Sequence, residues 1–474
     1  MEIVVIGGGV GGLTAALALG QGGHRVQVLE RASRFARSGP GLRLAPNATA
    51  VLAQLDLLDQ LLELGVRPSR AVLRDLGSGA KLAELDTGAP LTARYGAPFV
   101  VIGRADLLSL LCDACADADV ELRPGRNVIS VDQSHFASSV MGGAVVTCTD
   151  GRVYAGDVVV AADGAESVAR ALLGDGEPTG DGWAAYRAIV PAGAPADSLT
   201  GSSADLHAGG EIVAWAGSDA YFARYPIRVN EAYEQVAVFC SHLNPLVGAV
   251  SPGGTDQGSA LLSRDWGGPE ELDKAFSRAV EPVRAAVRLM RKDQCWRMID
   301  QAPLSSWAVD RVVLLGDVVH PMPAYLAQGA CQAIEDAAVL ADALASCPGP
   351  RGVVAALVGY QARRAPRVIR VSRARQVWES APLPRRPADD YAVSDWLYAP
   401  PRQPLPISRR RSGCSRHRLR WLPGRSCTGQ AEQESVRITS VFDFGLFALV
   451  VEEVLEGGGG FRGDFFGGEV AARE

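Results

Sequence analysis

The sequence predicts an α/β fold in which a parallel, nucleotide-binding sheet carries an inserted, mainly antiparallel sheet. Two observations predict the parallel, nucleotide-binding sheet. A glycine-rich loop at 7–12 follows a short β-branched run, and two later apolar runs end in glycine–aspartate corners at 162–164 and 315–317. A third observation predicts the insertion: between 183 and 239 the sequence changes to short alternating apolar runs, which are typical of antiparallel strands.

The N-terminal segment has the pattern of a β-α-β unit. Residues 2–6 are apolar and β-branched, 12–20 have helical spacing, and 25–29 repeat the strand pattern. Glycines at the turn from strand to helix let the chain bend tightly and bring main-chain N–H groups against a pyrophosphate at the helix N-terminus. These glycines are Gly7, Gly9 and Gly12.

Glu30 ends the second strand of this unit. A carboxylate at this point accepts hydrogen bonds from the ribose hydroxyls of an adenosine and repels a 2′-phosphate. Together with the glycine loop, Glu30 predicts a dinucleotide site of the Rossmann type. This pattern alone does not separate FAD from NAD.

Later elements continue both sheets. Residues 157–161 and 312–315 predict further parallel strands that enter turns, and 329–344 predicts a long amphipathic helix. The antiparallel strands are expected at 183–190, 211–215, 221–226 and 235–239.

The composition excludes several classes of protein. The chain has 474 residues, of which 47% are hydrophobic and 21% charged, and a formal net charge of −6. It has room for more than one domain and shows no overall basic character that would suit nucleic acid. The N-terminus lacks the regions of a signal peptide, and no stretch suits a membrane span. We expect a cytoplasmic protein with neither a nucleic-acid nor a membrane partner.

The nine cysteines, an odd number, fit free thiols in a reducing compartment. Cys112 and Cys115 have the spacing of a metal-binding pair, but no second pair follows, and both lie in a helical pattern over 106–118. Packed thiols are the better interpretation, and we expect no metal site.

The C-terminal region changes character at about residue 400. An arginine run at 409–411 opens a stretch rich in Arg, Pro, Ser and Cys, and a glycine run at 457–460 follows. A basic run can bind nucleic acid, but no recognisable module accompanies it. We expect an atypical, disordered tail, and an out-of-frame extension would explain its composition.

Three linked motifs in this chain resemble those of the FAD-dependent aromatic hydroxylase family, the group A flavoprotein monooxygenases. The resemblance runs from Met1 to about Ala399 and is closest to the 3-hydroxybenzoate 6-hydroxylase and salicylate hydroxylase branch. It implies a fold similar to that of p-hydroxybenzoate hydroxylase. The motifs are Arg104 to Leu108, Val159 to Ser167 with Arg170, and Leu315 to Pro321 continued by Tyr325 to Ala330 and Ala333 to Ala337.

The resemblance implies how the chain is divided into domains and what each domain binds. A discontinuous FAD-binding domain is expected at 1–75, 99–180 and 285–375, with a substrate-binding β-sheet domain at 76–98 and 181–284. A C-terminal segment at 376–399 and the atypical tail at 400–474 complete the chain.

The resemblance also implies which residues hold FAD. Asp317 would accept hydrogen bonds from the ribityl chain, and Arg104 would brace the pyrophosphate. Arg43 would lie near the ribose, and Asp163 would contact the nucleotide. The N-terminus of a helix at 328–330 would face the N1–C2 edge of the flavin, where the reduced ring carries negative charge. The complete cofactor set is Gly7, Gly9, Gly12, Glu30, Arg31, Arg43, Arg104, Asp163, Gly316, Asp317, Gly329 and Ala330.

The implied reaction is the hydroxylation of an aromatic acid or phenol through a C4a-hydroperoxide of the flavin. NADH or NADPH would dock transiently as co-substrate without a second Rossmann domain, and O₂ would supply the oxygen atom. The expected partners are therefore an aromatic small molecule and O₂. A homodimer is a further possibility that the sequence does not decide.

On the substrate side, Tyr221, Ala223 and Tyr225 alternate along one strand and so share a face. In the resembling branch the position of Tyr221 often carries a histidine that acts as the base. A free phenol titrates near 10, so a tyrosine needs tuning to act as a base at neutral pH. Packing of both tyrosines in the sheet core is the alternative. The candidate catalytic residues are Tyr221, Tyr225, Ala324 and Gln328.

His320 is interpreted as a structural member of its loop rather than as the base. Val318 and Val319 replace two small residues that the family usually has, and Ala324 replaces a larger one. These changes leave two alternatives open. One is a tailoring hydroxylase of a larger aromatic natural product, and the other is a catalytically impaired, flavin-binding relic.

Overall fold

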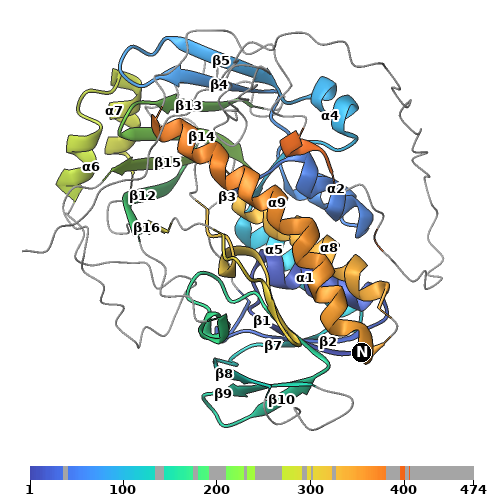
Figure 1. Ribbon diagram of the computed structural model, residues 1–474. Helices are drawn as coiled ribbons and strands as arrows, with labels where there is room; N and C mark the ends of the chain where they lie inside the picture. Colours follow the sequence, from blue (N-terminus) through green and yellow to red (C-terminus); the bar gives the residue numbers. More distant parts are fainter. Residues whose placement is uncertain are drawn as a thin grey trace, which may run out of the picture.

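The computed structural model describes 1–35, 41–133, 143–173, 180–191, 210–228, 232–240, 269–290, 296–299, 303–322, 327–347, 349–380, 396–400 and 405. Figure 1 shows two large sheets joined by a layer of helices. The predictions for Ala324, for 406–474 and for most of 376–399 lie outside the described residues.

A six-stranded sheet lies at the lower end of the molecule in Figure 1. Its strand order is β17-β18-β11-β1-β2-β7, and every neighbouring pair except β17–β18 is parallel. The inner strands β11 and β18 are short and buried throughout, as expected where parallel strands are covered on both faces. The strands are β1 (Glu2–Ile6), β2 (Arg25–Leu29), β7 (Glu121–Arg123), β11 (Val158–Ala161), β17 (Ala308–Val309) and β18 (Val312–Leu314).

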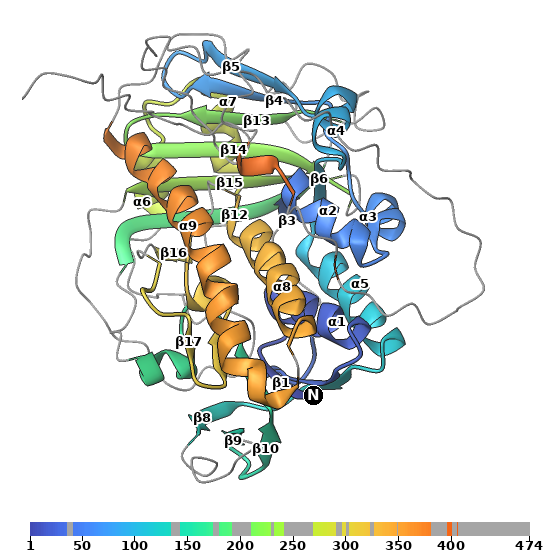
Figure 2. The ribbon, with the colours of Figure 1, turned by 45° about the vertical axis from the view of Figure 1, so that its right-hand side comes forward.

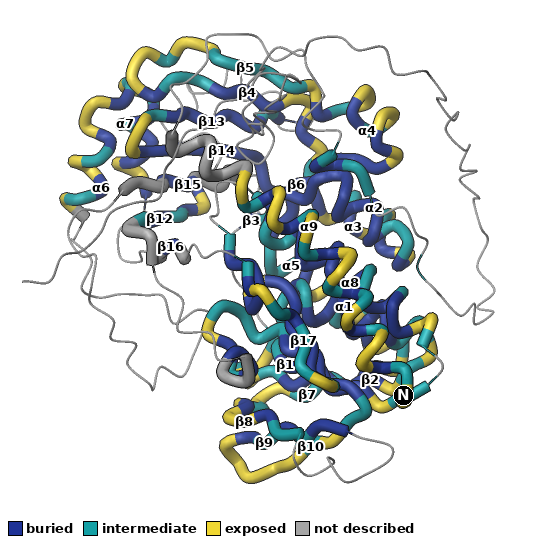
Figure 3. Tube along the Cα trace, viewed as in Figure 1, coloured by how far each residue is buried: buried dark blue, intermediate teal, exposed yellow. Residues whose placement is uncertain are grey.

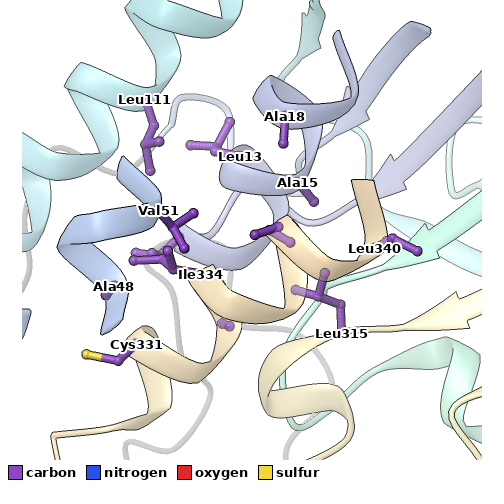
Figure 4. Close-up of a cluster of buried hydrophobic side chains, with 14 of the residues drawn as sticks. Leu13, Ala15, Ala18, Ala48, Val51, Leu111, Leu315, Cys331, Ile334 and Leu340 are labelled. Atoms are coloured by element: carbon purple, nitrogen blue, oxygen red, sulfur yellow. The ribbon is translucent and has the colours of Figure 1, made fainter. Parts of the chain in front are cut away.

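Four helices pack on one another over this sheet. Figure 4 shows Leu13 of α1, Leu111 of α5 and Ile334 of α8 in one apolar cluster with Val51 of α2. Gly11 of α1 lets α8 approach closely, because a Cβ added at Gly11 would lie 3.1 Å from Ala333 Cβ. The helices are α1 (Val10–Gln21), α2 (Pro46–Gln54), α5 (Arg104–Asp117) and α8 (Gly329–Ala345).

A seven-stranded, mainly antiparallel sheet lies at the upper end, as the turned view in Figure 2 also shows. Its order is β16-β12-β15-β14-β13-β4-β5, and only β13 and β4 pair in parallel. Two short helices cover one face, where Phe276 and Val287 pack on Phe222. The elements are β4 (Arg70–Asp75), β5 (Lys81–Asp86), β12 (Gly180–Pro191), β13 (Ile212–Ala216), β14 (Ala220–Ile227), β15 (Ala232–Cys240), β16 (Trp296–Ile299), α6 (Pro269–Ala275) and α7 (Glu281–Arg288).

The remaining elements connect these layers. A three-stranded antiparallel sheet, β10-β9-β8, lies beside the six-stranded sheet, and a two-stranded one, β3-β6, lies next to β14. The elements are β3 (Gly41–Leu44), β6 (Val100–Gly103), β8 (Val128–Asp132), β9 (Ala144–Cys148), β10 (Val153–Gly156), α3 (Leu58–Leu64), α4 (Ala89–Tyr95), α9 (Val353–Ser380) and the 3₁₀ turns η2 (Val168–Leu173), η6 (Gly316–Val318) and η8 (Pro350–Gly352).

The predicted fold class is confirmed, and the predicted strands and helices form close to their expected bounds. The domain boundaries stay a prediction. By strand pairing, β4 and β16 belong to the seven-stranded sheet, although both fall in ranges expected for the FAD-binding domain. Figure 3 shows buried residues concentrated at the centre of the molecule, while β5, at the edge of the seven-stranded sheet, is partly exposed. Within the described ranges, no helix has the length and apolarity to cross a membrane.

Helices α8 and α9 are joined by an ion network inside the protein. Arg364 of α9 donates from Nε to Asp336 Oδ1 at 2.6 Å and from Nη1 to Glu335 Oε2 at 2.7 Å. The three side chains are at most 2% exposed, so both carboxylates depend on this guanidinium for compensation of their charge. Arg367 adds two bonds to Glu335 and donates to the carbonyl oxygens of residues 396, 397 and 399.

We predict that Arg364→Ala lowers the free energy of unfolding by about 3–5 kcal/mol, because it leaves two buried carboxylates uncompensated. Arg363→Ala is the matched control on the same helix. Its side chain is 34% exposed and pairs with Asp342 at the surface, so the expected loss is about 0–1 kcal/mol. Urea unfolding of both variants measures the difference, and equal losses would contradict the prediction.

Candidate active site

The three sequence corners meet at one edge of the six-stranded sheet. They follow β1, β11 and β18, which are adjacent and parallel, so their carboxyl ends lie side by side. The main chain continues this pairing beyond the strands: Ala162 N donates to Ile6 O at 2.8 Å, and Leu315 N donates to Ala161 O at 2.9 Å. The fold thus brings together Gly7, Asp163 and Gly316, which are far apart in the sequence.

The glycines of the first corner divide into packed and open positions. A Cβ added at Gly7, where φ is +98°, would lie 2.4 Å from Ala162 O, and one added at Gly12 would lie 2.0 Å from Gly7 O. These two glycines therefore permit close packing of the turn. At Gly9, which precedes the first residue of α1, an added Cβ meets no heavy atom within 4 Å. The open side of Gly9 gives a phosphate access to the helix N-terminus.

Glu30 lies directly beneath this loop. Its carboxylate accepts hydrogen bonds from Gly8 N at 2.7 Å and from Ala32 N at 2.9 Å. An ionised carboxylate has about four acceptor positions, so it keeps capacity for ribose hydroxyls. Arg31 is exposed, and its charge acts on Asp163 by lowering that carboxyl's pKa.

Arg104 begins α5 and lies among charged groups of the site. Burial lowers the pKa of Arg104 and Arg187 acts in the same direction, while Asp317 and Glu30 oppose them. Arg104 Nε is buried and has no hydrogen-bond partner. A guanidinium with a donor to spare, which interacts with both Glu30 and Asp317, suits a pyrophosphate oxygen.

The aspartates of the second and third corners differ in their surroundings. Asp163 accepts a hydrogen bond from Val168 N at 3.1 Å, and burial raises the pKa of its carboxyl. Asp317 is exposed, and its Oδ1 lies 3.6 Å from the Cβ position of Gly329. Asp317 and the start of α8 therefore border the same space.

The N-terminus of α8 is held from behind by side chains. Gln328, which is 1% exposed, accepts hydrogen bonds from Asn47 Nδ2 at 3.3 Å and from Gln332 Nε2 at 3.1 Å. Its side-chain oxygen is thus turned into the protein. The partly exposed Gly329 and Ala330 present the first main-chain N–H groups of α8, which have no partner within the helix.

Asp336 anchors the Gly316 turn to this helix. Its Oδ2 accepts from Gly316 N at 3.0 Å and lies 2.7 Å from His320 Nε2. Burial by itself raises the pKa of Asp336, but His320 and Arg364 outweigh it and lower the pKa to about 2. His320 is fully buried and packs on Trp307. These contacts support its interpretation as a structural residue of the loop.

The β14 tyrosines form a cluster with two arginines. Tyr221 and Tyr225 share the face of β14 that packs in the first core, while Phe222 lies on the other face. Arg43 of β3 donates to the Tyr221 hydroxyl at 3.4 Å and lies 5.2 Å from the centroid of the Tyr225 ring. Arg187 of β12 donates to the Tyr225 hydroxyl and to Gly41 O, both at 3.0 Å.

The structure directs the Arg43 side chain to these tyrosines, whereas the sequence predicted that it lies near the ribose; the ribose contact stays a prediction. Burial opposes the charge of Arg43, but the two tyrosine oxygens favour it, and the net effect raises its pKa. The Arg43 carbonyl accepts from Cys331 Sγ in the first turn of α8 at 3.6 Å. Arg43 therefore connects the helix N-terminus with the tyrosine pair.

The residues that support the site through other side chains were not predicted from the sequence. No role was predicted from the sequence for Arg187, Arg364 or Arg367. A signal existed for the last two, because arginines three apart on a helix share a face, but their partners are on another helix. Among the described residues, His, Cys, Asp and Glu side chains form no group of three that could hold a metal ion.

The residues at this edge fit FAD. The open glycine at the start of α1 and the Arg104 guanidinium suit the pyrophosphate, Glu30 suits the adenosine ribose, and Asp317 suits the ribityl hydroxyls. The start of α8 suits the negatively charged edge of a reduced flavin. The fold and the site thus define a FAD-binding protein of the Rossmann type with a second sheet beside the flavin end.

Comparison with known proteins confirms this class. The chain matches the FAD binding domain family over residues 1–194 and 265–375. It is 30% identical to 3-hydroxybenzoate 6-hydroxylase of Klebsiella oxytoca over 393 residues, 81% of this chain and 88% of that protein. It is 34% identical to 3-amino-4-hydroxybenzoate 2-monooxygenase of Streptomyces cremeus over 389 residues, 82% and 89% of the two chains.

Structural comparison agrees on the fold. Klebsiella pneumoniae HpxO, solved with FAD and uric acid, superposes with a TM-score of 0.63 at 24% identity over 84% of this chain and 92% of that chain. The chain belongs to the family of FAD-dependent aromatic hydroxylases. The predicted family, enzyme class and FAD cofactor are thereby confirmed.

We expect Gly9→Ala and Gly12→Ala to fail in different ways. In Gly9→Ala the added methyl meets no protein atom, so the melting temperature is retained, but FAD affinity falls about tenfold or more because the methyl enters the phosphate's space. In Gly12→Ala the methyl meets Gly7 O, so stability falls by about 1–3 kcal/mol. Thermal unfolding and FAD titration of the apoprotein test both variants. A lowered melting temperature in Gly9→Ala would contradict the prediction.

The lowered pKa of Asp336 predicts a pH dependence of stability. Because its pKa is about 2 in the folded protein and about 3.9 in an unfolded chain, ionised Asp336 contributes about 2 kcal/mol above pH ~4. This contribution is lost as the pH falls from about 4 to about 2. Urea unfolding over this range should show a smaller slope with pH in Asp336→Asn than in the parent protein. Equal slopes would show that Asp336 is not the responsible group.

Proposed function

We propose that the protein is a FAD-dependent monooxygenase that uses NAD(P)H and O₂ to hydroxylate a hydroxy-substituted aromatic acid. The observation that carries this proposal is the arginine–tyrosine cluster of Arg43, Arg187, Tyr221 and Tyr225, which the main chain of Arg43 joins to the start of α8. The names of the relatives support the substrate class, since both act on a benzoate that bears a hydroxyl group.

The two guanidinium groups suit the two functional groups of such a substrate. A carboxylate gains strong, charge-assisted hydrogen bonds from arginine. A phenol beside a guanidinium ionises more readily, because the positive charge favours the oxygen anion. Ionisation makes the ring electron-rich, as electrophilic hydroxylation requires. The bound flavin would supply the oxygen transfer, with NAD(P)H as the source of electrons.

The apolar face around the cluster would keep water from the reacting ring. Leu42, Trp183 and Met322 are partly exposed apolar residues that pack against the main core, and we infer that they contribute to this face. Exclusion of water protects reactive oxygen intermediates and strengthens electrostatic contacts. The seven-stranded sheet would therefore supply Arg187, Tyr221 and Tyr225, and β3 would supply Arg43.

We also propose a cytoplasmic location. Among the described residues, Cys112, Cys115, Cys148 and Cys347 are free thiols, which fits a reducing compartment. A homodimer stays a hypothesis.

The two alternatives have less support. Ala324, which motivated a larger natural-product substrate, lies outside the described residues. Val318 and Val319, which motivated an impaired relic, are fully buried, and Val319 O accepts a hydrogen bond from Leu304 N at 3.1 Å. The surrounding core accommodates their bulk, so they do not argue for a disrupted site.

A substrate screen tests the proposed function. FAD-loaded protein is mixed with NADH or NADPH and with hydroxybenzoates, aminohydroxybenzoates, phenols without a carboxylate, and polycyclic phenols. We expect aromatic acids to stimulate NAD(P)H oxidation and to yield a product with one added oxygen atom. Stimulation by polycyclic phenols alone would favour the tailoring alternative, and FAD binding without any stimulation would favour the relic.

A further inference from the structure

The segment 396–399 packs against helices α4 and α9. Tyr398 is fully buried, and its ring meets the ring of Tyr95 edge to face, with 5.8 Å between the centroids. On the other side, the guanidinium carbon of Arg370 lies 4.2 Å from the centroid of the Trp396 ring. Aromatic pairs of this kind contribute more than the burial of their area. The segment is therefore held by one ring on each side.

Arg367 of α9 joins this segment to α8. Its guanidinium donates to the carbonyl oxygens of Trp396, Leu397 and Ala399 at 2.5, 2.9 and 3.3 Å. The same group donates to both carboxylate oxygens of Glu335, from Nε at 2.5 Å and from Nη2 at 2.7 Å. A guanidinium is a rigid, planar fork of five donors. One such fork therefore fixes the segment and the helix relative to each other, and together they form the 396–399 anchor.

Glu335 extends this anchor to the first turn of α8 by deciding which way two amides point. Burial raises the pKa of Glu335, but two nearby guanidinium groups outweigh it and lower the pKa. An ionised carboxylate can only accept, so Asn47 and Gln332 present their NH₂ groups to it, at 2.5 and 3.1 Å. The same NH₂ groups lie 3.3 and 3.1 Å from Gln328 Oε1. Two donors thereby fix the side chain of Gln328, the N-cap of α8.

Ala327, the residue before this N-cap, has a strained main chain. Its φ is +51°, in the left-handed region that residues with a Cβ rarely adopt. Such a conformation persists only where the surrounding contacts enforce it. Two contacts do so here: Gln328 is held by the two amides, and Ala327 O accepts from Cys331 Sγ at 3.5 Å. The strain lies where the chain sets the direction of the first main-chain N–H groups of α8.

We propose that Arg367 is a positioning residue for the flavin. With the 396–399 segment, it holds the strained turn at Ala327 and thereby directs the start of α8 at the N1–C2 edge of the ring. The inference concerns bound FAD and does not depend on which aromatic compound is hydroxylated. Main-chain N–H groups at a helix start stabilise the negative charge of a reduced flavin only when they point at it. Without the anchor, Ala327 relaxes out of the left-handed region, and the reduction potential of the flavin falls.

The midpoint potential of the FAD-loaded protein tests this role and needs no aromatic substrate. Arg367→Met should make two-electron reduction about tenfold less favourable, which corresponds to a potential about 30 mV lower. Ala327→Gly in the same background should restore most of this loss, because glycine adopts the left-handed region without strain. Ala327→Gly alone should leave the potential near the parent value. A general loosening of the fold would not be reversed by one glycine at this turn.

Three further variants separate positioning from charge. Arg367→Lys keeps the charge but cannot bind the carboxylate and three carbonyl oxygens at once, so its potential should also fall. Tyr398→Leu loosens the segment and changes no charge, so it should lower the potential as well, again with rescue by Ala327→Gly. Arg370→Met is the matched control, because it contacts the same segment but not Glu335. It should leave the potential unchanged.

The outcomes that would overturn the role of Arg367 are specific. They are a parent-like potential in Arg367→Met or in Arg367→Lys, and a lowered potential that Ala327→Gly does not restore. If Arg367→Met fails to fold or to retain FAD, Arg367→Lys and Tyr398→Leu decide by the same measurement. Absence of turnover with every aromatic acid would overturn the proposed function alone, since these potentials are measured without substrate.

Discussion

The buried contact of Arg364 with Glu335 and Asp336 is the interaction on which the site depends. One guanidinium on α9 compensates two adjacent carboxylates on α8, and each carboxylate holds a different part of the site. Asp336 fixes the Gly316 turn and His320, while Glu335 accepts from Asn47 and Gln332, which in turn bond to Gln328. Buried charges cost several kcal/mol to desolvate, so both carboxylates depend on the guanidinium and the hydrogen bonds that compensate them. The two flavin-facing segments thereby share one rigid support.

Close packing of small residues complements this network at the other end of the site. Gly7 and Gly12 let the first turn approach the Ala162 corner and its own helix, and Gly11 lets α1 approach Leu315. Each contact would be blocked by a single methyl group. A phosphate-binding turn must hold its N–H groups in place before the ligand arrives, since a flexible loop would lose ordering entropy on binding. The same packing that forms the core therefore prepares the nucleotide site.

The seven-stranded sheet separates its two functions by the alternation of its strands. On β14, Phe222 packs in the core with residues of α6 and α7, while Tyr221 and Tyr225 lie on the other face, toward β3. One face thus stabilises the sheet and the other presents polar groups to the flavin end. The two arginines of that face come from β3 and β12, so three strands from distant parts of the sequence define one polar cluster.

The sequence by itself determined the parallel sheet, its glycine and aspartate corners, the antiparallel insertion and the shared face of Tyr221 and Tyr225. These features depend on local periodicity and on turn chemistry, which the order of residues carries directly. Only the tertiary structure decided the direction of the Arg43 side chain, the pairing of Arg187 with Tyr225 and the support by Arg364. A long side chain on a strand or helix can reach several neighbours, and which one it meets depends on how separate elements pack. That packing is set by the whole core, so no local pattern around Arg43 or Arg364 contains it.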